Sequence, residues 1–296
     1  MSSIAVVPGA TIPSNEAMRA AGHSPGLSWL GRTGTPAEGS LPLHADQVRR
    51  FRRQGFLSIP DFAPPEAFED LARLRFIFDR LFAAHTGRKD GNYFDFAGAK
   101  TEEASCAAPQ MLHMSKYAPE LLDSPIVQQG WKVARQVLGE RARMIVDHGL
   151  LKPAGSSAAT PWHQDEAFWN ERYHHDGLSI WIPLQDVDEH NGCMQFASGS
   201  HRSGVMPHQA INNDPRIHGL EVAGLHPPRV VTCPLKLGGA TLHHARTLHY
   251  SAPNHSAADR RAYVLVFTGR VRRRIIPCER PWNHAKPAPR DDGASA

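Results

Sequence analysis

The second half of the chain consists of short apolar or alternating segments separated by residues that favour turns. A succession of such segments is typical of an antiparallel β-sandwich or a small β-barrel. The 24 Gly and 24 Pro among 296 residues support this interpretation, because both residue types interrupt helices. The predicted strands are 142–152, 162–169, 178–187, 193–198, 229–235, 240–249 and 261–268.

Helices are predicted in the first half of the chain. The first runs from His44 to Gly55, and the segment FLSIPDF that follows it reads as a strand. A second helix opens at Pro64-Pro65, and a third extends from an N-cap at Ser124 to Gly139. The second helix has one apolar stripe with a spacing near that of a helical turn, formed by Phe68, Leu71, Leu74, Phe78 and Leu81.

We therefore predict an α+β protein with an all-β core, organised as a single domain over residues 41–285. The helices occupy its first half, and the β core covers about 142–270. Residues 1–40 are rich in Gly, Pro, Ser and Thr and lack apolar periodicity, which favours a flexible tail over a lid that orders above a substrate. Residues 286–296 are predicted to form a flexible C-terminal tail.

Charge and cysteine content argue against several classes of protein. The formal net charge is +4, but the only dense basic run, Arg270–Arg274, has no interleaved aromatic residues, so we predict no nucleic-acid partner. No run of about 18 apolar residues is present, so no membrane span is predicted. The four cysteines are widely spaced and form no C-x-x-C pair, which indicates reduced thiols and a cytoplasmic protein.

The segment TPWHQDEAFW places His163 and Asp165 one residue apart within a predicted strand. Successive side chains of a strand face opposite sides, so these two side chains would point the same way. An H-x-D pair alone is weak evidence, because an ordinary hydrogen-bonded His–Asp pair gives the same pattern.

A third residue, His249, strengthens the metal hypothesis. Two imidazoles and one carboxylate form the facial triad of non-haem Fe(II) oxygenases, which leaves metal positions open. The absence of a thiolate argues against a structural zinc site. The rivals of His249 are His243, His244 and His255; alternation puts His243 on the same face as His249, behind the ligands, and turns His244 away.

These segments resemble the phytanoyl-CoA dioxygenase family of Fe(II)- and 2-oxoglutarate-dependent oxygenases. The resemblance covers roughly residues 45 to 270, and its specific parts are KPAGSSAATPWHQDEAFW, SIWIPLQDVDEHNGCMQFASGSHR and TLHYSAPN followed by DRRAY. It implies a double-stranded β-helix, a cupin-like jelly roll, for the β core. It also implies His163, Asp165 and His249 as metal ligands and catalytic residues, Fe(II) as cofactor, 2-oxoglutarate as cosubstrate and O2 as oxidant.

The resemblance also suggests which residues bind 2-oxoglutarate. Arg260 matches the family arginine that binds the distal carboxylate, with the adjacent Arg261 as its rival, and Ser251 corresponds to a hydroxyl that adds a hydrogen bond. Trp181 matches a tryptophan near the cosubstrate, although a core aromatic is equally compatible with its position. Lys152 falls in the family's KPxG segment, but we interpret it as a solvated lysine beside a loop.

The implied reaction is oxidation, chiefly hydroxylation, of an unactivated carbon, with release of succinate and CO2. Desaturation, epimerisation and cyclisation remain open, and a non-catalytic binding protein or a zinc hydrolase are the alternatives. Trp169 has the inward parity of His163 and is the candidate substrate contact, whereas Phe168 is expected to face outward under a helix. An acyl-CoA substrate would require a cluster of residues that binds its phosphates, and the sequence shows none, so we expect a small metabolite of secondary metabolism as substrate. The oligomeric state is not predicted.

Overall fold

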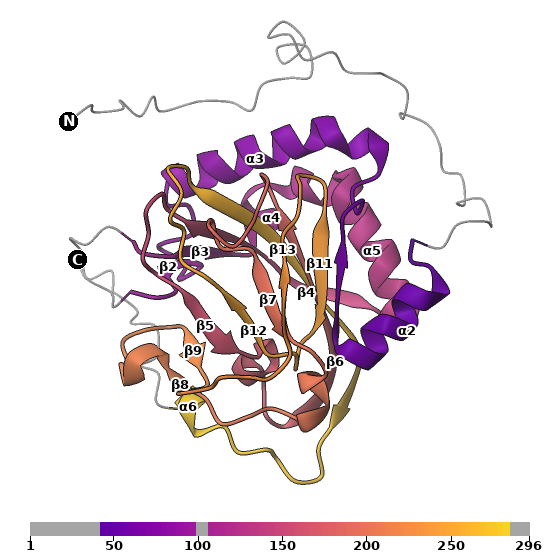
Figure 1. The fold of residues 1–296 in the computed structure, drawn as a ribbon, viewed down its shortest axis with the longest axis vertical. Coiled ribbons are helices and arrows are strands. Elements are labelled where there is room, and N and C mark those ends of the chain that lie inside the picture. Colours follow the sequence, from indigo (N-terminus) through magenta and orange to yellow (C-terminus); the bar gives the residue numbers. More distant parts are fainter. Residues whose placement is uncertain (1–41, 99–105, 285–296) are drawn as a thin grey trace, which may run out of the picture. The chain divides into compact units, whose positions relative to one another are not determined.

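The computed structural model describes residues 42–98 and 106–284, which form a sandwich of two antiparallel sheets of the jelly-roll type (Figure 1). The larger sheet has seven strands in the order β1-β11-β6-β13-β4-β3-β2. These strands are β1 Phe56–Ile59, β11 Ala240–His244, β6 Tyr173–Pro183, β13 Arg260–Arg273, β4 Arg143–Lys152, β3 Pro109–Leu112 and β2 Tyr93–Asp95.

The smaller sheet has four strands in the order β10-β7-β12-β5. Its strands are β10 Val230–Cys233, β7 Met194–Ala197, β12 His249–Ser251 and β5 Thr160–His163. A separate pair, β8 (Gln209–Ala210) and β9 (Leu220–Glu221), lies in the long connection between β7 and β10. Short 3-10 helices occur in the loops: η3 Asp165–Phe168, η4 Ser200–Ser203 and η5 Ile211–Asn213.

Helices α3 and α5 cover the outer face of the larger sheet (Figure 1). The close approach of α3 depends on Gly149 of β4, where a Cβ atom would lie 2.7 Å from side-chain atoms of Phe78, Phe82 and Met114. On α5, Trp131 packs edge-on against Phe267 of β13, with ring centroids 5.1 Å apart. The elements on this side are η1 Pro65–Ala67, α3 Phe68–Ala83, α4 Met114–Tyr117, η2 Pro119–Asp123 and α5 Pro125–Leu138.

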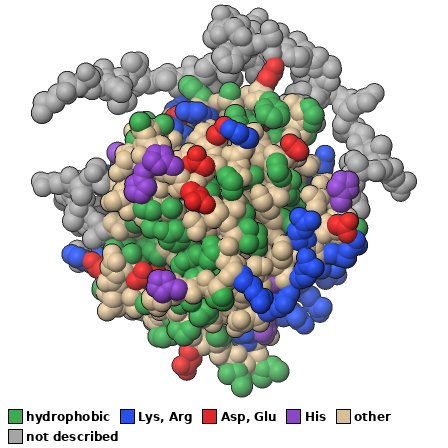
Figure 2. Space-filling model, in the orientation of Figure 1, with side chains coloured by type: hydrophobic (Ala, Val, Ile, Leu, Met, Phe, Trp, Pro, Cys, Tyr) green, Lys and Arg blue, Asp and Glu red, His purple; other side chains and the backbone are tan. Residues whose placement is uncertain are grey.

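Helix α2 (Ala45–Gln54) begins and ends close to the predicted bounds. Gly55 has a φ of 84° and donates its N–H to the Phe51 carbonyl, which closes the helix as a left-handed C-terminal glycine does. Four arginines of this helix are exposed, and the Lys and Arg side chains visible in Figure 2 gather near α2. Helix α2 therefore contributes much of this cluster, and further Lys and Arg side chains lie elsewhere on the same face.

The space between the two sheets is filled by side chains from both layers. Phe56 of β1 stacks on Phe196 of β7 with ring centroids 4.7 Å apart. Trp181 of β6 and Val264 of β13 belong to the same buried cluster. This packing fixes the separation of the sheets around the site described below.

Several predicted elements differ from the structure. The predicted strand at 56–62 ends at Ile59, before Pro60, because proline cannot donate to a strand ladder. The predicted strand 240–249 is two strands in different sheets, β11 and β12, joined by a turn. Strands β2 and β3 were not predicted. The predicted tails at 1–40 and 286–296 lie outside the described residues. Among the described residues, no helix is long and apolar enough to cross a membrane.

Candidate metal centre and cosubstrate pocket

Three predicted ligands meet at one end of the smaller sheet. His163 ends β5, His249 begins β12, and the two residues are paired in the antiparallel register. Asp165 is the first residue of η3. One ligand atom from each side chain lies within 4.8 Å of the others, and Asp165 Oδ1 is 3.4 Å from His249 Nε2 and 4.0 Å from His163 Nε2.

The predicted strand over 162–169 ends at His163, before Asp165. Gln164 keeps extended backbone (φ −129°, ψ 131°), the 3-10 turn begins at Asp165, and the buried side chain of Gln164 holds neighbouring loops. Its Nε2 donates to Gly204 O at 2.8 Å and Arg246 O at 2.6 Å, and its Oε1 accepts from Met206 N at 2.7 Å. Extended backbone at Gln164 places both ligands on the same side, as the predicted alternation requires, and the strand pattern is lost only from Asp165 onward.

Both histidines present the same nitrogen toward Asp165. The Nδ1 of His163 lies 2.8 Å from Pro161 O, and the Nδ1 of His249 lies 2.9 Å from Thr247 O. An N–H on each Nδ1 that donates to the carbonyl leaves each Nε2 as a lone-pair donor. Burial lowers the pKa of His163, and it lowers the pKa of His249 to well below its ordinary value. Neutral imidazoles are the form that binds a metal ion.

The carboxylate of Asp165 is held from the opposite sheet. Its Oδ2 accepts a hydrogen bond from Ser179 Oγ at 2.6 Å and lies 3.1 Å from His243 Nε2. Burial alone would raise the pKa of Asp165, but the imidazole of His249 and the contact with His243 hold it well below its ordinary value. His243 thus lies behind the proposed ligands as expected, although it comes from β11 in the other sheet.

A cavity of about 370 Å³ lies between the sheets beside this cluster. Arg260 lines it and is almost fully buried, and its Nε and Nη1 have no hydrogen-bond partner among the described residues. The guanidinium lies over the Trp181 ring, 5.6 Å from the centroid. Burial lowers the pKa of Arg260 to about 10, so it remains positive at neutral pH. Such a buried, unpaired cation is suited to an anionic ligand.

The neighbouring arginine is directed elsewhere. Arg261 forms ion pairs with Asp79 of α3 and, at 3.3 Å, with Asp259, outside the cavity. Alternation along β13 separates the two guanidinium groups, one facing the cavity and the other facing α3. Arg260 is therefore the one of the two that is available to a ligand in the cavity.

Ser251 and Lys152 line the cavity close to Arg260. Ser251 Oγ donates to Gly192 O at 2.8 Å. The expectation of a solvated Lys152 is wrong: the side chain is buried, and its Nζ donates to Ser251 O at 2.7 Å and Ala252 O at 2.6 Å. Burial, together with the nearby charge of Arg260, lowers the pKa of Lys152 well below its ordinary value. The sequence showed that Lys152 belongs to the KPxG segment, but it did not show that β4, which ends at Lys152, places this side chain inside the sandwich.

The rest of the cavity wall is largely aromatic and aliphatic. Trp169 lines it as predicted, but Phe168 lines it too, contrary to the expectation that it would face outward. The two adjacent residues share the cavity because η3 replaces the alternating strand. Phe96 and His218 lie nearby on the same wall.

Two polar residues of the cavity had no sequence signal. Gln110 of β3 and His148 of β4 both line it, and within the described part of the chain Gln110 Oε1 and His148 Nδ1 are buried without a hydrogen-bond partner. Burial lowers the pKa of His148 to about 4, so it is neutral near pH 7. In the antiparallel pairing of β3 with β4, Leu112 lies opposite His148, and Gln110 lies opposite Leu150. They are visible only once these strands are aligned.

Comparison with known proteins agrees with this geometry. The family Phytanoyl-CoA dioxygenase (PhyH) matches residues 51–262. The chain therefore belongs to this family. With the His–Asp–His set, this places it among the 2-oxoglutarate-dependent non-haem iron dioxygenases, whose cofactors are iron and 2-oxoglutarate.

Individual relatives show the extent of the similarity. The crystal structure of EvdO2 from Micromonospora carbonacea var. aurantiaca complexed with 2-oxoglutarate has 36% sequence identity and a TM-score of 0.69, covering 81% of this chain and 96% of that one. A probable alpha-ketoglutarate-dependent hypophosphite dioxygenase of Stutzerimonas stutzeri is 35% identical over 44% of this chain and 46% of its own length. For L-proline trans-4-hydroxylase of Streptomyces griseoviridis the values are 31%, 47% and 59%. The chain thus spans about half the length of these two curated relatives.

Proposed function

We propose that the protein hydroxylates an unactivated carbon of a small-molecule metabolite, using O2 and 2-oxoglutarate and releasing succinate and CO2. The observation that carries this proposal is the His163–Asp165–His249 cluster beside the unpaired guanidinium of Arg260 in one cavity. An anchored 2-oxoglutarate can complete the coordination of a metal ion that has only three protein ligands.

In this proposal the catalytic residues are His163, Asp165 and His249, which hold Fe(II). When bound, the iron together with 2-oxoglutarate and O2 supplies the oxidising power for the reaction. Arg260 binds the distal carboxylate of 2-oxoglutarate, and Trp181 supports the guanidinium through its ring face. Ser251 can add a hydrogen bond to the same carboxylate by redirecting its hydroxyl from Gly192 O.

The substrate is proposed to lie against Trp169 and the other aromatic residues of the wall. A cavity of about 370 Å³ has room for a compact molecule beside 2-oxoglutarate but not for an enclosed acyl-CoA. Gln110 and His148 offer hydrogen bonds to polar groups bound there. Hydroxylation is supported by L-proline trans-4-hydroxylase among the relatives. We also propose a cytoplasmic location, since all four cysteines are free thiols.

The test is succinate release by the purified protein. Wild-type protein should form succinate from 2-oxoglutarate slowly with Fe(II) in air, even without its substrate, and a metabolite library should contain a compound that accelerates the release. His163→Ala and Asp165→Ala should reduce succinate to the level of metal-free protein. His255→Ala, at an exposed histidine, is the matched control.

Three results would redirect the assignment. Wild-type protein that binds 2-oxoglutarate but never consumes it would be a non-catalytic binding protein. A product that keeps the mass of the substrate would indicate epimerisation, and a product two hydrogens lighter would indicate desaturation or cyclisation.

A further inference from the structure

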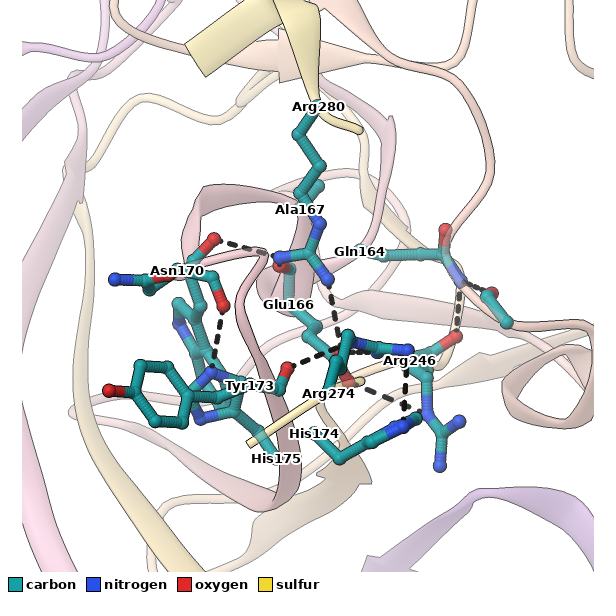
Figure 3. Close-up of polar contacts among 12 residues, drawn as sticks. Gln164, Glu166, Ala167, Asn170, Tyr173, His174, His175, Arg246, Arg274 and Arg280 are labelled. Carbon is teal, nitrogen blue, oxygen red and sulfur yellow. Dashed lines mark hydrogen bonds and ion pairs between the residues drawn. The ribbon is translucent and has the colours of Figure 1, made fainter. Parts of the chain in front are cut away.

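The segment that follows β13 contacts the short helix that carries Asp165. Residues 280–283 lie beyond the part of the chain that matches the family, which ends at residue 262. Figure 3 shows Arg280 approaching Glu166 and Ala167 from a separate part of the chain. Helix η3 has only four residues, and a 3-10 helix of that length has few hydrogen bonds of its own.

Arg280 is the centre of the contact. It has 0% exposure, and its Nη1 donates both to Glu166 O and, at 2.8 Å, to Trp169 O. Its Nη2 donates to Glu166 Oε1 at 3.1 Å. One guanidinium therefore binds a backbone carbonyl within η3, the carbonyl of the residue that follows η3, and the Glu166 side chain, which requires the fixed fork of arginine.

Two further donors complete the contact. Trp282 Nε1 and Asn283 Nδ2 both donate to Ala167 O, each at 3.0 Å. Three residues, Arg280 just before α6 (Pro281–His284) and Trp282 and Asn283 within it, thus donate to backbone carbonyls of η3 and of Trp169. The internal bonds of the turn are Ala167 N to Gln164 O and Trp169 N to Glu166 O.

The carboxylate of Glu166 ties this contact to other elements. It is buried and lies 3.1 Å from Arg280, 3.4 Å from Arg274 and 3.5 Å from Arg246 (Figure 3). Arg274 follows β13, and Arg246 lies in the turn between β11 and β12. Removing one partner from a buried charge group is costly, so the position of Glu166 is strongly determined.

From this geometry we infer that residues 280–283 form a C-terminal clasp that positions Asp165 and the Phe168–Trp169 wall of the cavity. Arg280 is a positioning residue, since its hydrogen bonds go to Glu166 and Trp169 and it acts on Asp165 only through η3. This inference rests on the proposed function of Asp165 as a metal ligand. A displacement of about 1 Å in a reacting group can reduce a rate on the order of 100-fold, so a four-residue turn needs such external support.

The test is metal affinity and spectroscopy in Arg280→Lys, which keeps the charge but loses the forked contact. Binding of Fe(II) to metal-free full-length protein is titrated anaerobically, well below the unfolding temperature of each variant. We expect the Kd for Fe(II) to rise about tenfold or more, since residues that orient metal ligands have effects of 10–100-fold. The charge-transfer absorption of the Fe(II)–2-oxoglutarate complex should shift or weaken. The Kd for 2-oxoglutarate should change less, because its proposed anchor, Arg260, lies on β13 and not on η3.

Trp282→Phe provides a second variant in case Arg280→Lys does not fold. It removes one donor to Ala167 O while the ring remains, and a smaller rise in the Kd for Fe(II) is expected. Glu279→Gln, at an exposed neighbouring position, is the matched control and should behave as wild type. Variants with a lowered unfolding temperature but a wild-type Kd and absorption band would overturn the clasp. If wild-type protein binds Fe(II) without consuming 2-oxoglutarate, the proposed function fails, while the metal titration still decides the clasp.

Discussion

At the scale of single residues, the two oxygens of Asp165 have different surroundings. Oδ2 is engaged by Ser179 and His243, whereas Oδ1 faces the Nε2 atoms of both histidines. A carboxylate held in this way offers one oxygen to a metal ion and keeps the other fixed. Single-oxygen binding leaves more of the coordination sphere to a bidentate cosubstrate, which the proposed chemistry requires.

The neighbouring arginines of β13 give a matched pair of variants. Arg260→Lys should raise the KM for 2-oxoglutarate about 100-fold, because a single ammonium cannot reproduce two parallel hydrogen bonds to a carboxylate. Arg261→Lys should leave this KM within about twofold, since Arg261 contacts Asp79 and Asp259 outside the cavity. Steady-state succinate release at varied 2-oxoglutarate measures both. Equal KM values for the two variants would contradict the assignment of Arg260.

At the scale of elements, the sequence predicted those whose signals are local. The bounds of α2 and α5 follow from Gly55 and from Ser124-Pro125, because a capping residue acts within one turn. Strands β4, β7 and β10 lie within or nearly within their predicted ranges.

The errors arise where contacts between distant residues decide the local structure. The turn that separates β11 from β12 is fixed by Thr247, whose Oγ1 donates to Gly55 O across the fold at 2.7 Å. The end of β5 depends on Gln164 and its contacts with Gly204 and Arg246. Strand β3 is extended because it pairs with β4. The H-x-D spacing and the family resemblance predicted that His163, Asp165 and His249 would lie together, as they do. Gln110, His148 and the clasp could not be predicted, since each needs partners far away in the sequence.

The contact between α3 and β4 gives a prediction at this scale. Gly149→Ala should lower the free energy of unfolding by about 1–3 kcal/mol, because the new methyl group would meet Phe78, Phe82 and Met114 at once in a well-packed layer. Denaturant titration of the metal-free protein measures the change. Arg143→Ala, at an exposed position of the same strand, should change it by less than about 0.5 kcal/mol. A Gly149→Ala protein as stable as wild type would show that α3 can move away without cost.

At the scale of the whole molecule, the site depends on both sheets. The proposed metal ligands belong to β5, η3 and β12 at the smaller sheet, whereas Ser179, His243, Trp181 and Arg260 come from the larger one. The packing of Phe56 on Phe196 holds the two layers at the separation that this arrangement needs. Helices α3 and α5 cover the larger sheet, and the clasp contacts η3 beside the smaller one. The site is therefore a product of the sandwich and not of one loop.

The stability of the sandwich should be sensitive to acid, because it buries histidine side chains in their neutral form. Burial lowers the pKa of His208 to about 4 and of His244 to about 3, whereas an unfolded chain has histidines that titrate near 6.5. Between these values the unfolded state binds more protons, so the free energy of unfolding should fall as the pH is lowered from about 7 to about 5. Each histidine contributes at most about 1.4 kcal/mol per pH unit, and less for the partly exposed His244. Above pH 7 both states are neutral at these positions, and their contribution is constant.

Denaturant titration of the metal-free protein at pH 7.5, 6.5 and 5.5 measures the slope. His244→Asn, whose Oδ1 can accept from Arg246 N as the Nδ1 of His244 does at 3.0 Å, should reduce the slope without changing its sign. A stability that rises on acidification over this range would show that these histidines become charged in the folded protein.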